Sequence, residues 1–129
     1  MTTTTTDPDT KAYALGIEIT THHGGERGRR YIDGTISLRD DLGPINRRCT
    51  LANELGHHVH NHQPIPAMHD RQEREANDYA AELLIGPDEY QEAEALCDGH
   101  SGGIARELGV TVELVHVWQV LQVRKQQEN

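Results

Sequence analysis

Aromatic residues and cysteine are scarce in this sequence of 129 residues, which has no phenylalanine, one tryptophan, four tyrosines and two cysteines. The core must therefore be built mainly from aliphatic side chains. The sequence has no segment that resembles a signal peptide and no apolar run near membrane-spanning length. Cys49 and Cys97 both lie in helical patterns, where a small buried thiol is expected rather than a disulfide. These absences predict a cytoplasmic protein with no membrane partner.

Positive charge is also scarce, because 12 lysines and arginines stand against 21 aspartates and glutamates and give a net charge of -9. A field of this sign repels phosphate backbones, so no nucleic acid is expected as the principal partner. Residues 104–118 do match the small, turn and core positions of a helix-turn-helix. However, residues 111–119 contain no lysine or arginine, and phosphate contacts normally need several. A structural helical pair is the favoured interpretation, and a DNA reader is the distant alternative.

The length predicts one domain, over residues 11–124. Residues 1–10 are a threonine run followed by Asp-Pro-Asp, and this polar start predicts a disordered tail. Residues 125–129 are polar as well and predict a short C-terminal tail.

Two segments carry strand signals. Residues 14–20 alternate apolar and polar positions, and residues 31–39 contain Asp33-Gly34, a strong hairpin signal. Together they predict a small antiparallel sheet of about three strands.

Helices follow the sheet, and the first of them carries the chemistry. Apolar or small residues at Ile45, Cys49, Ala52, Gly56 and Val59 have the spacing of a buried helical stripe. Further helices are predicted at residues 70–85 and 88–97, and residues 104–118 predict two short helices around a turn at Gly109. A proline-rich turn is predicted at 63–67, before the first of these helices. The predicted fold class is α+β: the sheet packs on two helices, and a C-terminal helical region follows.

Residues 53–57 read Asn-Glu-Leu-Gly-His, which is one residue away from a zinc-protease helix. That helix needs two histidines one turn apart, so that both imidazoles face one metal ion, and a glutamate after the first to polarise the bound water. Here His57 is the second histidine and Glu54 is the glutamate, while Asn53 stands where the first histidine is needed.

The following helix offers a further ligand. Glu73 lies on the apolar stripe of residues 70–85, whereas Glu75 lies on a polar face and needs no partner. A carboxylate facing the core is costly unless it meets a cation. A zinc ion would neutralise Glu73 and connect the two helices.

Asn77 and the histidines that follow His57 are close to this predicted site in the sequence. Asn77, one turn after Glu73, has two equal interpretations: it hydrogen-bonds a metal-ligand histidine, or it satisfies loop backbone. Among the histidines that follow His57, only His60 is placed to replace a missing ligand. His58 and His62 are expected to be solvated.

Residues 47–57, 73–84 and 104–110 together resemble the ImmA/IrrE family of metallo-endopeptidases, and the resemblance covers about residues 14–121. It implies a zincin fold and a zinc-dependent endopeptidase, often encoded by phages and mobile elements, that cleaves a helix-turn-helix repressor. It also implies that His57 and Glu73 bind zinc, that Glu54 is the general base and that Asn77 supports a ligand. An extended substrate is then expected to pair with the sheet edge near residues 35–38.

The departure from the family pattern, Leu-Ala-His-Glu-Leu-Gly-His, is Asn53. An amide oxygen is a weaker zinc ligand than imidazole. Three outcomes are open: weak metal binding through Asn53 with activity retained, recruitment of His60 or a water molecule, or a catalytically silent protein that binds its partner without cutting it.

Overall fold

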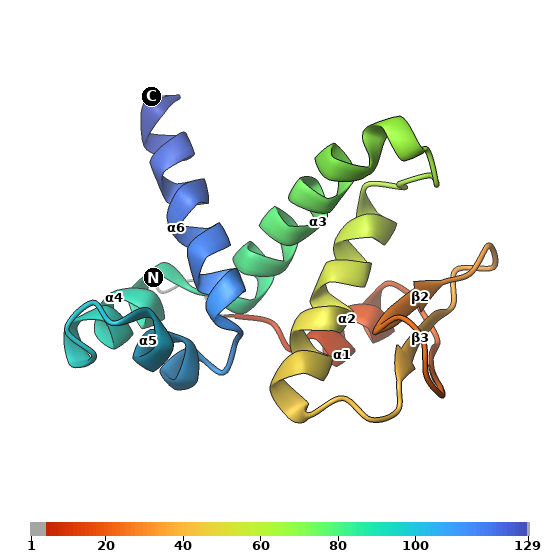
Figure 1. The fold of residues 1–129 in the computed structure, drawn as a ribbon, viewed down its shortest axis with the longest axis horizontal. Coiled ribbons are helices and arrows are strands. Elements are labelled where there is room, and N and C mark those ends of the chain that lie inside the picture. The colour runs from red at the N-terminus through yellow and green to blue at the C-terminus, as the bar shows by residue number, and fades with distance from the viewer. Residues whose placement is uncertain (1–4, 129) are drawn as a thin grey trace.

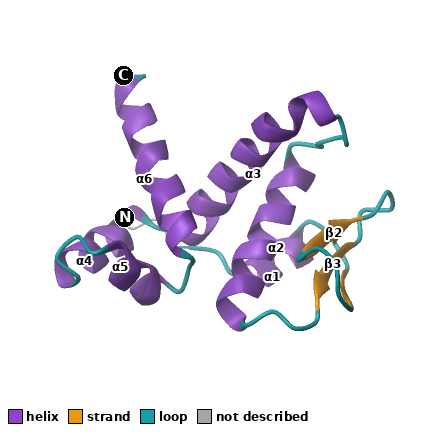
Figure 2. Ribbon diagram, in the orientation of Figure 1, coloured by secondary structure: helices purple, strands orange, loops and turns teal. Residues whose placement is uncertain are grey.

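The computed structural model describes residues 5–128, which form an α+β fold with a small sheet at one side, next to α1 and α2 (Figures 1 and 2). In chain order the elements are α1 (Pro8–Ala14), β1 (Ile19–His22), β2 (Gly28–Arg30), β3 (Ile36–Arg39), α2 (Pro44–Val59), the 3₁₀ helix η1 (Pro66–Met68), α3 (His69–Leu84), α4 (Pro87–Leu96), α5 (Ser101–Leu108) and α6 (Val112–Gln127). The predicted fold class is therefore confirmed. Among the described residues, no helix is long and apolar enough to cross a lipid bilayer.

The N-terminal segment is more ordered than the sequence predicts. Asp7 caps α1 by accepting a hydrogen bond from the Thr10 amide, and Pro8 occupies the first helical position, where its missing N–H costs nothing. Ala12 of this helix is buried. The predicted tail is thus wrong for residues 8–10, while residues 1–4 lie outside the described part of the chain.

The sheet is mixed rather than antiparallel. Its strand order is β1-β3-β2, with β1 parallel and β2 antiparallel to β3. The strand expected at residues 14–20 is mostly wrong, because α1 continues to Ala14 and Gly16 then turns the chain at φ +73°. The Asp33-Gly34 hairpin is present, although Ile32 lies fully exposed in its loop instead of in a strand.

The sheet order also moves the free edge. Residues 36–39 form β3, the central strand, which is paired on both sides. The predicted docking edge near residues 35–38 is therefore wrong, because the backbone groups there already have partners. The edge that lies next to α2 belongs to β2.

Helix α2 separates two hydrophobic clusters. Leu51 and Leu55 pack with the sheet and α1, whereas Ala52 on the opposite side packs with α3 to α6. The predicted stripe is partly wrong, because Ile45 and Val59 are exposed and the buried residues are Leu51, Ala52, Leu55 and Gly56. Only the middle of the helix is enclosed on both sides, so its end positions do not bury the apolar residues there.

Helices α2 and α3 approach each other most closely at Gly56. A Cβ atom at this position would lie 2.7 Å from the carbonyl oxygen and 2.8 Å from the Cα of Ala76. Such a contact is too short for any side chain, so a glycine is needed there. The close approach fixes the spacing of the side chains that face the cleft between the two helices.

The C-terminal helices complete the larger cluster, in which Tyr90 stacks on Trp118 with ring centroids 4.2 Å apart. Gly109 ends α5 in the left-handed conformation, which confirms the predicted turn between the last two helices. The predicted tail at residues 125–129 is partly wrong, since α6 continues to Gln127 and Lys125 pairs with Glu82 at 2.8 Å. Figure 1 shows α6 and α3 spreading apart toward the C-terminal end of α6.

Candidate metal centre

Two predicted ligands, His57 on α2 and Glu73 on α3, meet across the interface of these helices. His57 Nε2 lies 2.7 Å from Glu73 Oε2, and their side chains are 12% and 40% exposed. Ligand atoms on a tetrahedral zinc ion are about 3.4 Å apart when each bond is about 2.1 Å. A small rotation of the half-exposed Glu73 side chain would provide that separation, so the pair converges on one point as a metal site requires.

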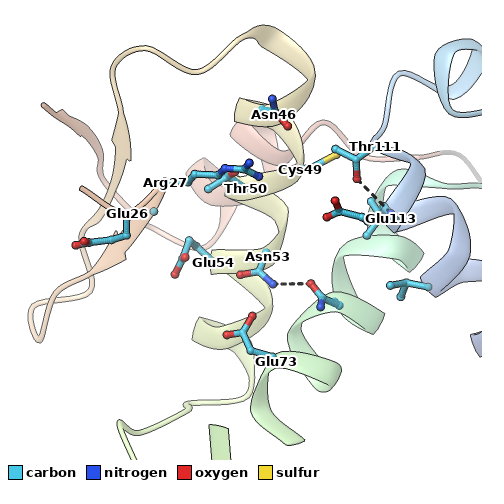
Figure 3. Close-up of a pocket in the computed structure, with 14 residues that line it drawn as sticks. Glu26, Arg27, Asn46, Cys49, Thr50, Asn53, Glu54, Glu73, Thr111 and Glu113 are labelled. Carbon is cyan, nitrogen blue, oxygen red and sulfur yellow. Dashed lines mark hydrogen bonds between the residues drawn. The ribbon is translucent and has the colours of Figure 1, made fainter. Parts of the chain in front are cut away.

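Asn53 lines the same cleft as Glu73, but its amide group is already engaged. Its Nδ2 donates a hydrogen bond of 2.8 Å to Oδ1 of Asn77 on α3. Figure 3 shows the Asn53 oxygen on the side of the cleft that Glu54 and Glu73 line. Of the two interpretations of Asn77, the structure favours the contact with the residue at the ligand position.

Glu54 is the half-buried acid of the site. Burial raises its pKa to about 7, an effect that Glu73 adds to and Arg30 opposes. A Cβ atom on Gly28 of β2 would lie 2.7 Å from Glu54 Oε2, so the strand backbone passes directly over the carboxyl group. A peptide backbone placed along β2 would therefore lie next to Glu54. The pKa of this carboxyl group suits it to exchanging a proton near neutral pH.

The cleft extends on both sides of these acids. One cavity of about 390 Å³ is lined by Gly28, Asn53, Asn77 and other residues of α2 and α6. Another of about 590 Å³ is lined by His57 and the hairpin loop. Glu54 and Glu73 line both cavities, so they lie in the middle of one elongated depression.

The histidines after His57 are placed differently from the prediction. His62 is only 8% exposed. Its Nδ1 lies 2.9 Å from Nδ1 of His57, and its Nε2 lies 3.0 Å from Oε1 of Glu75. The expectations that His62 is solvated and that Glu75 lacks a partner are both wrong, because the chain leaves the helix before His62 and folds back.

His60 lies with His62 and Glu75, and these are the residues that form a cluster of three metal donors within the described chain. Among the described residues, no cluster of three metal donors includes His57 or Glu73. The expectation that His60 replaces the missing ligand therefore gains no support. Helical periodicity cannot place residues beyond a helix end. The available signal was Asn61, whose φ of 52° is a conformation that asparagine tolerates better than most residues.

Burial lowers the pKa of His57, and the neighbouring Glu73 opposes this shift. A neutral imidazole with one free nitrogen is the form that binds a metal ion. Imidazole and carboxylate are ordinary zinc donors, and the Asn53 oxygen supplies a third, weaker one. The residues present therefore fit a zinc ion, with lower affinity than a site that has two histidines.

The fold and the cleft define a metallopeptidase-like protein, in which a histidine and a glutamate from two adjacent helices flank a half-buried acid. The model of the IrrE N-terminal-like domain matches residues 12–117, so the chain belongs to this peptidase family. The resemblance to the ImmA/IrrE family is thereby confirmed. A comparison with curated proteins gave no match.

Proposed function

We propose that this protein is a zinc-dependent endopeptidase that acts on an extended polypeptide. The observation that carries the proposal is the convergence of His57 and Glu73, 2.7 Å apart, beside the half-buried Glu54. This arrangement supports hydrolysis because the two ligands and the acid belong to the same cleft.

His57, Glu73 and the amide oxygen of Asn53 would hold the ion. A zinc ion held there would supply Lewis-acid chemistry, which would make a water molecule easier to deprotonate. Glu54 accepts the proton from the attacking water and passes it to the leaving amine. Its pKa of about 7 in the metal-free chain allows it to carry out both transfers.

The substrate chain would lie along β2. This strand is at an edge of the sheet and passes over Glu54, so a peptide paired with it would present its carbonyl groups to the acid. Edge pairing binds backbone groups and therefore requires an extended segment. The resemblance to the family suggests a helix-turn-helix repressor as the protein that supplies this segment.

A second candidate is a binding module that captures the same partner without cutting it. The residue at the first ligand position favours it, because Asn53 offers an amide oxygen where the family pattern has an imidazole. Loss of one imidazole ligand lowers zinc affinity while the fold and the β2 edge stay the same.

Metal content and cleavage of an unstructured protein substrate distinguish the two candidates. The wild type is compared with Asn53→His and with Asn46→His as a matched control, since Asn46 lies on the same helix and lines the same cavity two turns away. Stoichiometric zinc and cleavage in the wild type would establish the peptidase. Cleavage that is seen only with Asn53→His would rule out the peptidase and leave the binding module, and the control variant should resemble the wild type.

A further inference from the structure

A second group of metal-binding side chains lies where the chain turns from α2 toward α3. The donor atoms of His60, His62 and Glu75 all lie within 4.8 Å of one another. The rings of His60 and His62 are stacked, with centroids 5.3 Å apart and planes 11° apart. Asn61 in the left-handed conformation places both rings on one side, and Arg30 holds the turn by donating a 2.6 Å hydrogen bond to the His62 carbonyl.

We propose that His60, His62 and Glu75 bind one divalent transition-metal ion at a second site, separate from the His57 and Glu73 centre. Two imidazoles and one carboxylate on one side of an ion suit Zn²⁺, Fe²⁺ or Ni²⁺ and leave the remaining positions to water. His62 Nε2 and Glu75 Oε1 are already 3.0 Å apart. His60 is exposed, so its ring can turn to complete the set.

The two sites share one hydrogen bond, between Nδ1 of His57 and Nδ1 of His62 at 2.9 Å. A hydrogen bond between two nitrogens needs one proton, and a neutral imidazole carries one. When His57 binds a metal ion through Nε2, its proton lies on Nδ1 and is donated to His62. The proton of His62 must then lie on Nε2, where it is donated to Glu75 and blocks metal binding.

The reverse arrangement is equally restricted. When His62 binds a metal ion through Nε2, its proton lies on Nδ1 and is donated to His57, whose own proton then lies on Nε2 and faces Glu73. If both Nε2 atoms bound metal, two N–H groups would face each other across 2.9 Å. Occupancy of one site therefore weakens the other. This second site exists whether or not the protein cleaves peptides.

Calorimetric titration of metal-stripped, full-length protein with Zn²⁺ tests the site. Glu73→Gln removes the anionic ligand of the first centre, and this variant is expected to bind one equivalent at the second. Adding His60→Ala should lower the affinity at least about 10-fold, as expected for loss of a metal ligand. Adding His69→Ala instead should leave it unchanged, because His69 is an exposed histidine outside the cluster. Equal affinities for these two double variants would overturn the proposal.

The coupling has its own test in the single variants. The wild type should bind fewer than two equivalents of Zn²⁺ at concentrations that saturate Glu73→Gln and His60→Ala separately. Two equivalents, bound with the affinities of the single variants, would show that the sites are independent and that the shared proton does not link them. Because this readout is metal binding, a lack of peptidase activity in any variant would count against the proposed function alone.

Discussion

Gly56→Ala should destabilise the protein, although alanine favours a helix more than glycine does. The new methyl group would meet the carbonyl oxygen and Cα of Ala76 at 2.7 and 2.8 Å. Both are backbone atoms and cannot rotate away, so the two helices must separate. Overpacking of this kind costs about 2–3 kcal/mol, and the gain in helix propensity returns about 1 kcal/mol. The expected net loss is about 1–2 kcal/mol.

Thermal unfolding followed by circular dichroism measures this loss, because about 1 kcal/mol corresponds to about 4 °C in a chain of this size. A fall of about 4–8 °C in the melting temperature is expected. Gly43→Ala is the matched control, since it lies at the start of the same helix and its Cβ would have no neighbour within 4 Å. Gly43→Ala should lower the free energy of unfolding by less than about 1 kcal/mol. A Gly56→Ala protein more stable than the wild type would refute the packing argument.

Three further predictions concern charge and reactivity. In metal-free protein, Glu54→Gln should raise the free energy of unfolding by about 2–3 kcal/mol at pH 8 and leave it unchanged at pH 4, as urea titrations can show. The reason is that the folded chain, with a Glu54 pKa of about 7, holds a proton that the unfolded chain releases near pH 4.5, so wild-type stability falls as pH rises between these values. Asp9→Asn should lower the free energy of unfolding by less than about 1 kcal/mol at pH 7 and should leave it unchanged at pH 2. Arg47 lowers the pKa of the Asp9 carboxyl group, which is 46% exposed, and the stabilisation is lost as the pH falls through that lowered value. Cys49, whose thiol pKa is raised by burial, should react with iodoacetamide at pH 8 at least about 10-fold more slowly in the folded protein than in urea, as mass spectrometry can follow.

Helical periodicity placed Asn53 and His57 one turn apart and put Glu73 on the apolar stripe of α3, and the structure brings His57 and Glu73 together. It also placed the turn at Gly109.

Periodicity failed where contacts between distant segments decide the outcome. The parallel pairing of β1 with β3 depends on a crossover that no local pattern records, so the sheet direction and its free edge were mispredicted. The contacts of His62 depend on a turn beyond the end of α2 and on Arg30 of β2. Neither can be derived from the spacing of histidines along the sequence.

The substitution at Asn53 has a specific chemical consequence that one further variant can reveal. Nδ2 of asparagine and Nδ1 of histidine are both bonded to Cγ, so a histidine there could donate to Asn77 in the same way as the present amide. What asparagine lacks is Nε2, which extends one bond further from Cγ toward the metal position. Asn53 thus retains the half of a ligand histidine that contacts the protein and offers the ion only a shorter, weaker amide oxygen.

Asn53→His should therefore fold with a melting temperature within about 4 °C of the wild type, because no hydrogen bond is lost and the cleft has room for the larger ring. Its zinc affinity should rise at least about 100-fold, since an imidazole replaces an amide oxygen. Both measurements are best made with His60→Ala also present, so that the second site does not contribute. A variant that is strongly destabilised would show that the Asn77 contact cannot accept a histidine. Unchanged zinc affinity in a stable variant would show that His57 and Glu73 are not metal ligands.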